Sequence, residues 1–168
     1  RVRSFARRLR GVAAACACLL GYTPAFAAPP LPSDSLYQLP LPLTDQAGAR
    51  YDWRTFRGKP RVVSMFYTSC PYICPLIVDA GKTIERSLSP VEQQHMGIVL
   101  VSMDPAHDTP KALHGVVDKR GLDTARWTLA TPRPDDVRAV AGVLGIRYRL
   151  LAENTSDVIV RCALDGTL

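Results

Sequence analysis

The sequence lacks internal repeats and low-complexity segments, and only 21% of its 168 residues are charged. These absences exclude a disordered, a collagen-like and a coiled-coil protein. Aromatic residues account for only 7% of the chain, whereas hydrophobic residues make up 47%. That amount of apolar side chain is enough for one ordinary globular domain with a sizeable core.

The first 27 residues contain no acidic side chain, but they contain five arginines within positions 1–10. An apolar stretch follows over residues 11–22, and Ala25-Phe26-Ala27 supplies the small-x-small pattern that a signal peptidase recognises. The stretch is shorter than the roughly 20 residues that a membrane-spanning helix needs. We therefore interpret residues 1–27 as a cleaved signal peptide, with an uncleaved membrane anchor as the alternative.

The positive charge of the chain is concentrated in this segment. Without it, 16 basic residues face 15 acidic ones, so the net charge falls from +6 to +1. No cluster of Lys and Arg remains that suggests a phosphate-binding surface, and we predict no nucleic-acid partner. The rest of the chain is expected in the periplasm or otherwise exported, and associated with the inner membrane only if the segment is retained.

Cysteine is scarce, with five residues in the chain. Cys16 and Cys18 fall within the apolar stretch, and we interpret them as signal-peptide residues rather than a lipoprotein site. Cys70, Cys74 and Cys162 remain after cleavage. Thiols outside the cytosol oxidise unless something reduces them or a metal holds them. An odd number therefore leaves at least one thiol to explain.

The remaining chain alternates strand patterns with helix patterns. Residues 28–42 are rich in proline and are expected to form an extended, exposed tether, and residues 43–168 form the domain. The alternation predicts an α/β fold with a mainly parallel central sheet flanked by helices. A hairpin is expected over 43–56, strands over 61–67, 97–103, 127–130 and 157–163, and helices over 76–88, 110–120 and 134–145.

The most informative segment is Thr68-Ser69-Cys70-Pro71-Tyr72-Ile73-Cys74-Pro75, where a buried strand gives way to a helix. Pro75 is tolerated in the first turn of a helix, so Cys74 is expected beside the helix N-terminus. The positive end of the helix dipole lowers a thiol pKa and favours the thiolate that attacks disulfides and binds metals. The spacing lets both sulfurs converge as a disulfide or as two soft ligands for Cu(I). The alternative is an inert disulfide that staples a loop.

Three further segments accompany this motif: Leu43-Thr44-Asp45-Gln46, Phe56-Arg57-Gly58-Lys59-Pro60 and Val101-Ser102-Met103-Asp104-Pro105-Ala106-His107-Asp108-Thr109-Pro110. With them, the chain resembles the Sco/SenC family of thioredoxin-fold copper chaperones for cytochrome c oxidase. The resemblance implies a thioredoxin-like fold in which Cys70 and Cys74 bind copper, as Cu(I) or Cu(II). It also implies that this dithiol reduces a disulfide on the copper-binding subunit of the oxidase. That subunit, or another periplasmic copper or thiol protein, would be the partner.

The chain departs from the family at the third copper ligand, a histidine in a segment of the type Asn-His-Ser or Asn-His-Thr-Ser. Here the segment reads Glu153-Asn154-Thr155-Ser156. Either Thr155 takes the place of the histidine, or the histidine is deleted after Asn154. The loss of one ligand should weaken copper binding, although two thiolates alone can hold Cu(I).

The chain contains three histidines, and all of them precede this segment. His107 follows a strand at the carboxyl edge of the expected sheet, where α/β sites gather, so it is the candidate substitute ligand. The alternative is a solvated loop histidine. His95 and His114 occupy helix-associated positions and are expected at the surface.

Other polar and apolar residues near the motif have structural interpretations. We interpret Asp108 as a helix N-cap and Asp104 as a turn residue that, by the resemblance, also shapes the loop beside the thiols. Cys162 is expected to pack inward as a small hydrophobe. Tyr72 and Ile73 are expected to be exposed or half-exposed, either in a partner-docking surface or in local packing.

Three functional hypotheses follow. The first is an exported copper chaperone, and the second is a thiol-disulfide oxidoreductase on the same fold, a role that needs no histidine. In the second, the sequence leaves open which of Cys70 and Cys74 is the nucleophile. The third is a truncated, inactive relative, because the chain stops within an expected terminal hairpin and lacks the helix that would normally follow it.

Overall fold

The computed structural model describes residues 30–33, 35–70, 72–152 and 158–163. The chain divides into two units, Arg1–Pro30 and Leu31–Leu168, and the helices and strands described below all belong to the second. The predicted signal peptide over residues 1–27 lies outside the described residues. Within the described ranges, no helix is long and apolar enough to cross a membrane.

The core of the domain is a five-stranded sheet with the strand order β2-β1-β5-β4-β3. Strands β3, β4 and β5 are parallel to their neighbours, whereas β1 is antiparallel to both β2 and β5. The expected α/β fold is therefore confirmed, with an antiparallel edge formed by the first hairpin. The strands are β1 (Pro42–Asp45), β2 (Arg50–Asp52), β3 (Arg61–Phe66), β4 (Gly97–Ser102) and β5 (Trp127–Pro132).

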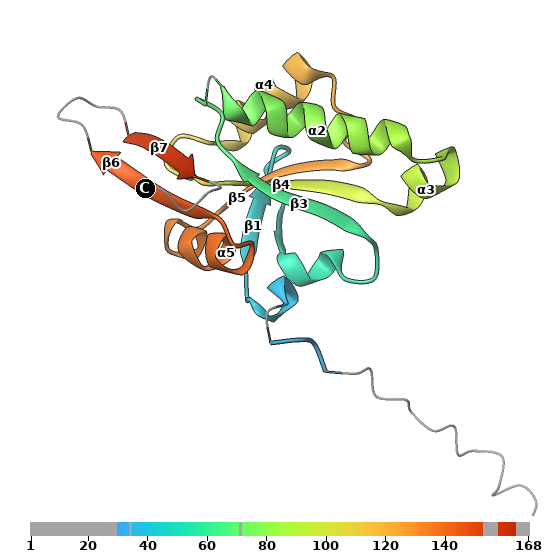
Figure 1. The fold of residues 1–168 in the computed structure, drawn as a ribbon, viewed down its shortest axis with the longest axis horizontal. Coiled ribbons are helices and arrows are strands. Elements are labelled where there is room, and N and C mark those ends of the chain that lie inside the picture. The colour runs from blue at the N-terminus through green and yellow to red at the C-terminus, as the bar shows by residue number, and fades with distance from the viewer. Residues whose placement is uncertain (1–29, 34, 71, 153–157, 164–168) are drawn as a thin grey trace, which may run out of the picture. The chain divides into compact units, whose positions relative to one another are not determined.

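Helices cover both faces of this sheet (Figure 1). Helices α2 (Ile73–Ser87) and α4 (Pro110–Arg120) pack on one face, and the 3-10 helix η2 (Trp53–Phe56) and helix α5 (Val137–Val143) pack on the other. Strand β4 lies between the two layers, with all six residues buried. Its apolar side chains alternate between the two core clusters, which is why its sequence is a continuous apolar run.

Helix α2 crosses the sheet at close range because a glycine faces β5. A Cβ atom added at Gly81 would lie 2.5 Å from Cη2 of Trp127, whose side chain is fully buried. Glu85, one turn later on α2, accepts a hydrogen bond from Nε1 of Trp127 at 3.1 Å. These contacts fix the height and rotation of α2, and therefore the position of its first turn.

Two short elements were not expected from the sequence. Helix α3 (Pro90–His95) begins with a capping box, in which Ser89 and Glu92 hydrogen-bond to each other's backbone N–H. The 3-10 helix η1 (Leu36–Gln38) lies inside the segment expected to be an exposed tether. Residues 36–42 are only partly exposed: Leu41 is 1% exposed, and Leu36, Tyr37 and Leu39 pack against the same core cluster, whereas the polar and proline positions between them face solvent.

The chain continues into a two-stranded antiparallel sheet formed by β6 (Arg147–Ala152) and β7 (Val158–Ala163). The sequence predicted β7 but not β6. Cys162 lies on β7 opposite Tyr148 in the register, and its side chain lies outside the described residues, so its predicted inward packing stays a prediction. Residues 164–168, where the sequence was expected to stop within a terminal hairpin, also lie outside the described residues.

Candidate functional site

The two cysteines flank the connection between β3 and α2, at the carboxyl end of the parallel strands. After β3, the backbone N–H of Cys70 donates to the carbonyl of Tyr67 at 3.3 Å, which closes a turn. Helix α2 starts at Ile73, so Cys74 and Pro75 both lie in its first turn. The position predicted for Cys74 at the helix N-terminus is therefore confirmed, with the helix beginning three residues earlier than expected.

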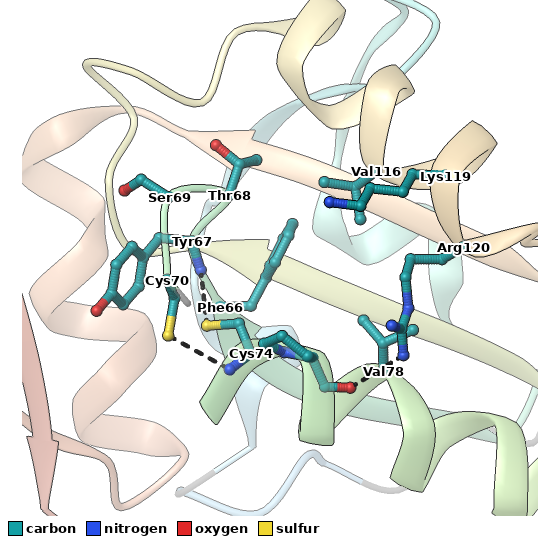
Figure 2. Close-up of a pocket in the computed structure, with 11 residues that line it drawn as sticks. Phe66, Tyr67, Thr68, Ser69, Cys70, Cys74, Val78, Val116, Lys119 and Arg120 are labelled. Atoms are coloured by element: carbon teal, nitrogen blue, oxygen red, sulfur yellow. Dashed lines mark hydrogen bonds between the residues drawn. The ribbon is translucent and has the colours of Figure 1, made fainter. Parts of the chain in front are cut away.

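Backbone N–H groups point at both sulfurs. The N–H of Cys74 donates to Sγ of Cys70 at 3.4 Å, and the N–H of Tyr67 donates to Sγ of Cys74 at the same distance (Figure 2). Both cysteines are thiols in the structure rather than a disulfide. Cys74 is 7% exposed and belongs to the core, whereas Cys70 is half-buried. The two thiols therefore share one turn but differ in their access to solvent.

The environment of Cys70 favours its thiolate. Burial acts to raise the pKa of this thiol, because it removes solvent from the charged form. Hydrogen bonds from Cys74, Tyr72 and Tyr67 act in the opposite direction and outweigh the burial, so the pKa of Cys70 lies below its usual value. A thiol with a lowered pKa is the better nucleophile and the better metal ligand at neutral pH.

A pocket opens beside the cysteines, between the β3–α2 connection and helix α4 (Figure 2). Thiols and hydroxyls line one part of it, apolar side chains form its walls, and two cations of α4 line the remainder. The lining residues are Phe66, Tyr67, Thr68, Ser69, Cys70, Cys74, Pro75, Val78, Val116, Lys119 and Arg120.

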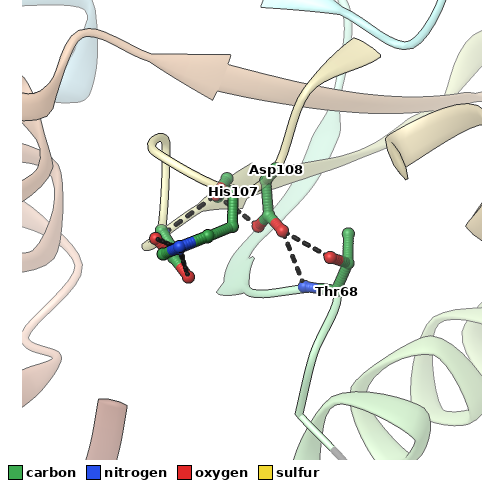
Figure 3. Close-up of polar contacts among 5 residues, drawn as sticks. Thr68, His107 and Asp108 are labelled. Atoms are coloured by element: carbon green, nitrogen blue, oxygen red, sulfur yellow. Dashed lines mark hydrogen bonds and ion pairs between the residues drawn. The ribbon is translucent and has the colours of Figure 1, made fainter. Parts of the chain in front are cut away.

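The loop that carries the cysteines is tied to the loop after β4 by a buried carboxylate (Figure 3). Oδ1 of Asp108 accepts from the backbone N–H and the hydroxyl of Thr68, at 3.0 and 2.5 Å, and Oδ2 accepts from the hydroxyl of Ser102 at 2.5 Å. Asp108 has no exposed surface. Its predicted role as an N-cap is wrong: Thr109 caps α4 by accepting from the N–H of Ala112, so the Asp108 side chain turns inward instead.

Burial raises the pKa of Asp108, while the hydrogen bonds from Ser102 and Thr68 act to lower it and the charge of Asp104 adds to the increase. The net direction is upward, so ionisation of this carboxyl opposes folding. The carboxylate is nevertheless supplied with donors on both oxygens, as a buried acid requires.

Asp104 forms the turn that was predicted for it. Its carbonyl accepts from the backbone N–H groups of His107 and Asp108, at 3.1 and 2.9 Å. Its nearly buried carboxylate faces Nδ1 of His107 at 2.9 Å, and the imidazole itself is 56% exposed. Among the residues that the structure describes, no three His, Cys, Asp or Glu side chains are arranged to hold a metal. His107 is therefore not brought into a ligand cluster with the thiols.

The remaining predicted residues fall into two groups. His95 and His114 are exposed, as predicted, and so is Tyr72, which is 80% exposed beside Cys70. The side chain of Ile73, and the whole segment with Asn154 and Thr155, lie outside the described residues. Four residues complete the surroundings of the thiols, and no role was predicted for them from the sequence: Thr68, Ser102, Lys119 and Arg120.

Most of this chain is similar to known proteins. The family model described as SCO1/SenC matches residues 31–160. A curated relative, a putative copper-binding protein of Stutzerimonas stutzeri, is 30% identical over 73 residues, which are 44% of this chain and 36% of that protein. The chain thus matches little more than a third of that relative's length.

Solved structures share the fold. A copper-bound ScoI of Bradyrhizobium japonicum superposes with a TM-score of 0.64 at 21% identity, covering 74% of this chain and 77% of that one. A copper-bound ScoI of Arabidopsis thaliana gives a TM-score of 0.59 at 25% identity, covering 74% of this chain and 76% of that one. The central sheet and its flanking helices therefore have the thioredoxin-like arrangement of these proteins.

The Asp108 contacts generate a prediction about stability. Asp108→Ala leaves two part-buried donors of Thr68 and the buried hydroxyl of Ser102 without an acceptor. The substitution should lower the free energy of unfolding by about 3 kcal/mol, measured by urea denaturation. Asp118→Ala, which removes an exposed carboxylate from α4, is the matched control and should change stability by less than about 0.5 kcal/mol. Equal unfolding midpoints for Asp108→Ala and the unmodified protein would contradict the role assigned to this carboxylate.

Proposed function

The chain belongs to the SCO1/SenC family, and we propose that it is an exported copper chaperone that helps to assemble the copper site of cytochrome c oxidase. In this proposal Cys70 and Cys74 bind Cu(I), with Cu(II) as a second state of the same site. The oxidase's copper-binding subunit, or another exported copper or thiol protein, is the partner. The structures of copper-bound relatives support the proposal.

One observation carries the copper-binding part of the proposal: two thiols lie in a single hydrogen-bonded turn beside a pocket. Thiolates are soft ligands, which suit Cu(I) better than they suit hard cations. The lowered pKa of Cys70 favours the deprotonated sulfur that a metal requires. Cys74 lies in the first turn of α2, where the helix dipole stabilises a second negative sulfur.

The third ligand of the family pattern has no counterpart in the described part of the chain. His107 faces Asp104, and its imidazole is not in a cluster with the two thiols. The segment from Glu153 to Ser156, which replaces the histidine pattern, lies outside the described residues. Binding of Cu(I) by this chain is therefore proposed to depend on the two sulfurs alone.

An anaerobic titration of the reduced protein with Cu(I), against a competing chelator, tests this proposal. We expect tight one-to-one binding. Cys70→Ser and Cys74→Ser should each weaken it by more than the roughly 10- to 100-fold that is lost when a hydrogen-bonding partner of a metal ligand is removed. Cys162→Ser is the matched control and should bind as the unmodified protein does. Unchanged affinity in Cys70→Ser, or no binding by the folded unmodified protein, would reject the site.

Export is the part of the proposal that depends on residues 1–27. Its support is the arginine-rich start, the short apolar stretch and the Ala25-Phe26-Ala27 pattern. If a signal peptidase cleaves after Ala27, N-terminal sequencing of the protein from a periplasmic extract should begin at Ala28. Recovery of the uncleaved chain from the cytosol alone would refute export.

The different exposure of the two cysteines favours a second candidate, a thiol-disulfide oxidoreductase. Cys70 is the more accessible thiol and has a lowered pKa, whereas Cys74 is buried and its backbone N–H donates to the Cys70 sulfur. Cys70 would therefore attack the substrate disulfide, and Cys74 would resolve the mixed disulfide.

In that case Cys74→Ser should trap a mixed disulfide on Cys70, detected by mass spectrometry after reaction with a small disulfide. Cys70→Ser should react far more slowly at this site, because Cys74, the other thiol of the pair, is buried. The reaction rate of the Cys74→Ser protein should rise with pH as Cys70 ionises. The pH at the midpoint of this rise should be lower for the folded protein than for the same protein unfolded in urea, because the fold lowers the pKa of Cys70. Equal rates for the two variants would show that neither sulfur is the preferred nucleophile and would remove this candidate.

A further inference from the structure

We propose that the pocket beside Cys70 and Cys74 binds small thiols and disulfides that carry a carboxylate, with Lys119 as the cation that attracts them. The proposal names a substrate class for the thiol site described above, and it rests on the proposed function only in using the same two sulfurs. Lys119 and Arg120 extend from α4 on one side of Phe66, and the two sulfurs lie on its other side (Figure 2).

The charges around the pocket are unbalanced in favour of cations. Three basic residues, Lys82, Lys119 and Arg120, lie at the junction of α2 and α4, where Nζ of Lys82 donates to the carbonyl of Arg120. Asp79 pairs with Arg120, and the buried Asp108 hydrogen-bonds to Thr68, but neither carboxylate lines the pocket, whose lining contains Lys119 and Arg120 and no acidic side chain. A pocket with this excess of positive charge attracts an anionic ligand and raises its local concentration.

The side chains of Lys119 and Arg120 differ in how many hydrogen-bond and ion-pair partners they have within the described part of the chain. The guanidinium of Arg120 donates to the carbonyl of Pro75 at 3.3 Å as well as to Asp79, so it joins α4 to the first turn of α2. Its Nε is buried and has no hydrogen-bond partner among the described residues. The side chain of Lys119 is exposed and makes no hydrogen bond or ion pair with the described part of the chain. Lys119 is therefore the charge available to an incoming carboxylate.

The rest of the pocket suits a short aliphatic chain between a sulfur and a carboxylate. Phe66, Val78 and Val116 give apolar walls between the thiols and the cations. The hydroxyls of Thr68 and Ser69 lie at the cysteine end. Ligand pockets commonly combine such apolar walls with a few polar groups that fix orientation. A small carboxylated disulfide can then place one sulfur at Cys70 while its carboxylate faces Lys119.

The reaction at this site is thiol-disulfide exchange and needs no other oxidant. The Cys70 thiolate attacks one sulfur of the small disulfide, which breaks the S–S bond and releases one small thiolate. The Cys74 thiol loses its proton to solvent and attacks Sγ of Cys70, which releases the second thiolate. The protein is oxidised by two electrons to the Cys70–Cys74 disulfide, and the small disulfide is reduced to two thiols. Two small thiols reduce the protein by the reverse steps.

The test compares three disulfides with similar two-carbon arms and different charge: dithiodipropionate, which is anionic, dithiodiethanol, which is neutral, and cystamine, which is cationic. The second-order rate constant of each with the reduced protein is measured at low ionic strength. We expect the anionic disulfide to react faster than the neutral one, and the cationic disulfide to react more slowly. The ratio of the anionic rate to the neutral rate should fall as salt is added, because salt screens exposed charges.

Lys119→Gln should lower this ratio by about fivefold, which is the effect of one exposed charge a few ångströms away. Lys119→Glu should lower the ratio further. Lys111→Gln is the matched control, because Lys111 is an exposed lysine of α4 that does not line the pocket, and it should keep the unmodified ratio.

An unchanged ratio in Lys119→Gln, or an equal fall in Lys111→Gln, would overturn the proposal. The assay contains no copper, so its failure is distinct from failure of the copper proposal. Tight Cu(I) binding together with an unchanged ratio in Lys119→Gln would refute this inference alone. A ratio that depends on Lys119 in a protein that binds no Cu(I) would support the inference and refute the copper chaperone.

Discussion

The surroundings of the thiols depend on one buried carboxylate, that of Asp108. It holds the backbone N–H and hydroxyl of Thr68 on one oxygen and the hydroxyl of Ser102 on the other, so the loops after β3 and β4 are joined at their bases. Cys70 lies two residues after Thr68, within a turn that this contact anchors. The cost of the arrangement is visible in the raised pKa of Asp108, since a carboxylate with no exposed surface is poorly solvated. Three donors offset that cost, and with them the carboxylate joins two loops that parallel strands place side by side.

The second constraint is the position of α2. Gly81 lets the helix approach Trp127 on β5, and Glu85 accepts from the same indole. With the middle of the helix fixed, its first turn brings the N–H of Cys74 to the sulfur of Cys70, while the sulfur of Cys74 sits in the core and accepts from Tyr67. The difference in exposure between the two thiols is therefore a consequence of packing well away from them. The proposed thiol-disulfide exchange uses this difference, because an incoming disulfide must reach one sulfur while the second lies beside it to resolve the mixed disulfide.

Much of the fold could be predicted because the signals are local. The apolar runs at β3 and β4, the Thr109-Pro110 start and the Gly121 end of α4 each occupy a few neighbouring positions. The cysteine pair was found for the same reason. The prediction for Asp108 was wrong because its contact is long-range. An Asp just before a helix is commonly an N-cap, but here Thr109 is the N-cap. The Asp108 carboxylate instead accepts from Thr68, which is 40 positions away in the sequence. The contribution of Lys119 and Arg120 to the pocket depends on how α4 lies against α2, which no short segment encodes.

The balance of forces on Cys70 links the thiol site to its pocket. Burial acts to raise the pKa of this half-buried thiol, and the hydrogen bonds from the turn outweigh burial, so the pKa is lowered. The half-buried sulfur of Cys70 lines the pocket, and in our proposal Lys119 on the opposite wall favours anionic ligands. The proposed copper binding and the proposed thiol exchange would therefore both take place at one pair of sulfurs beside one pocket.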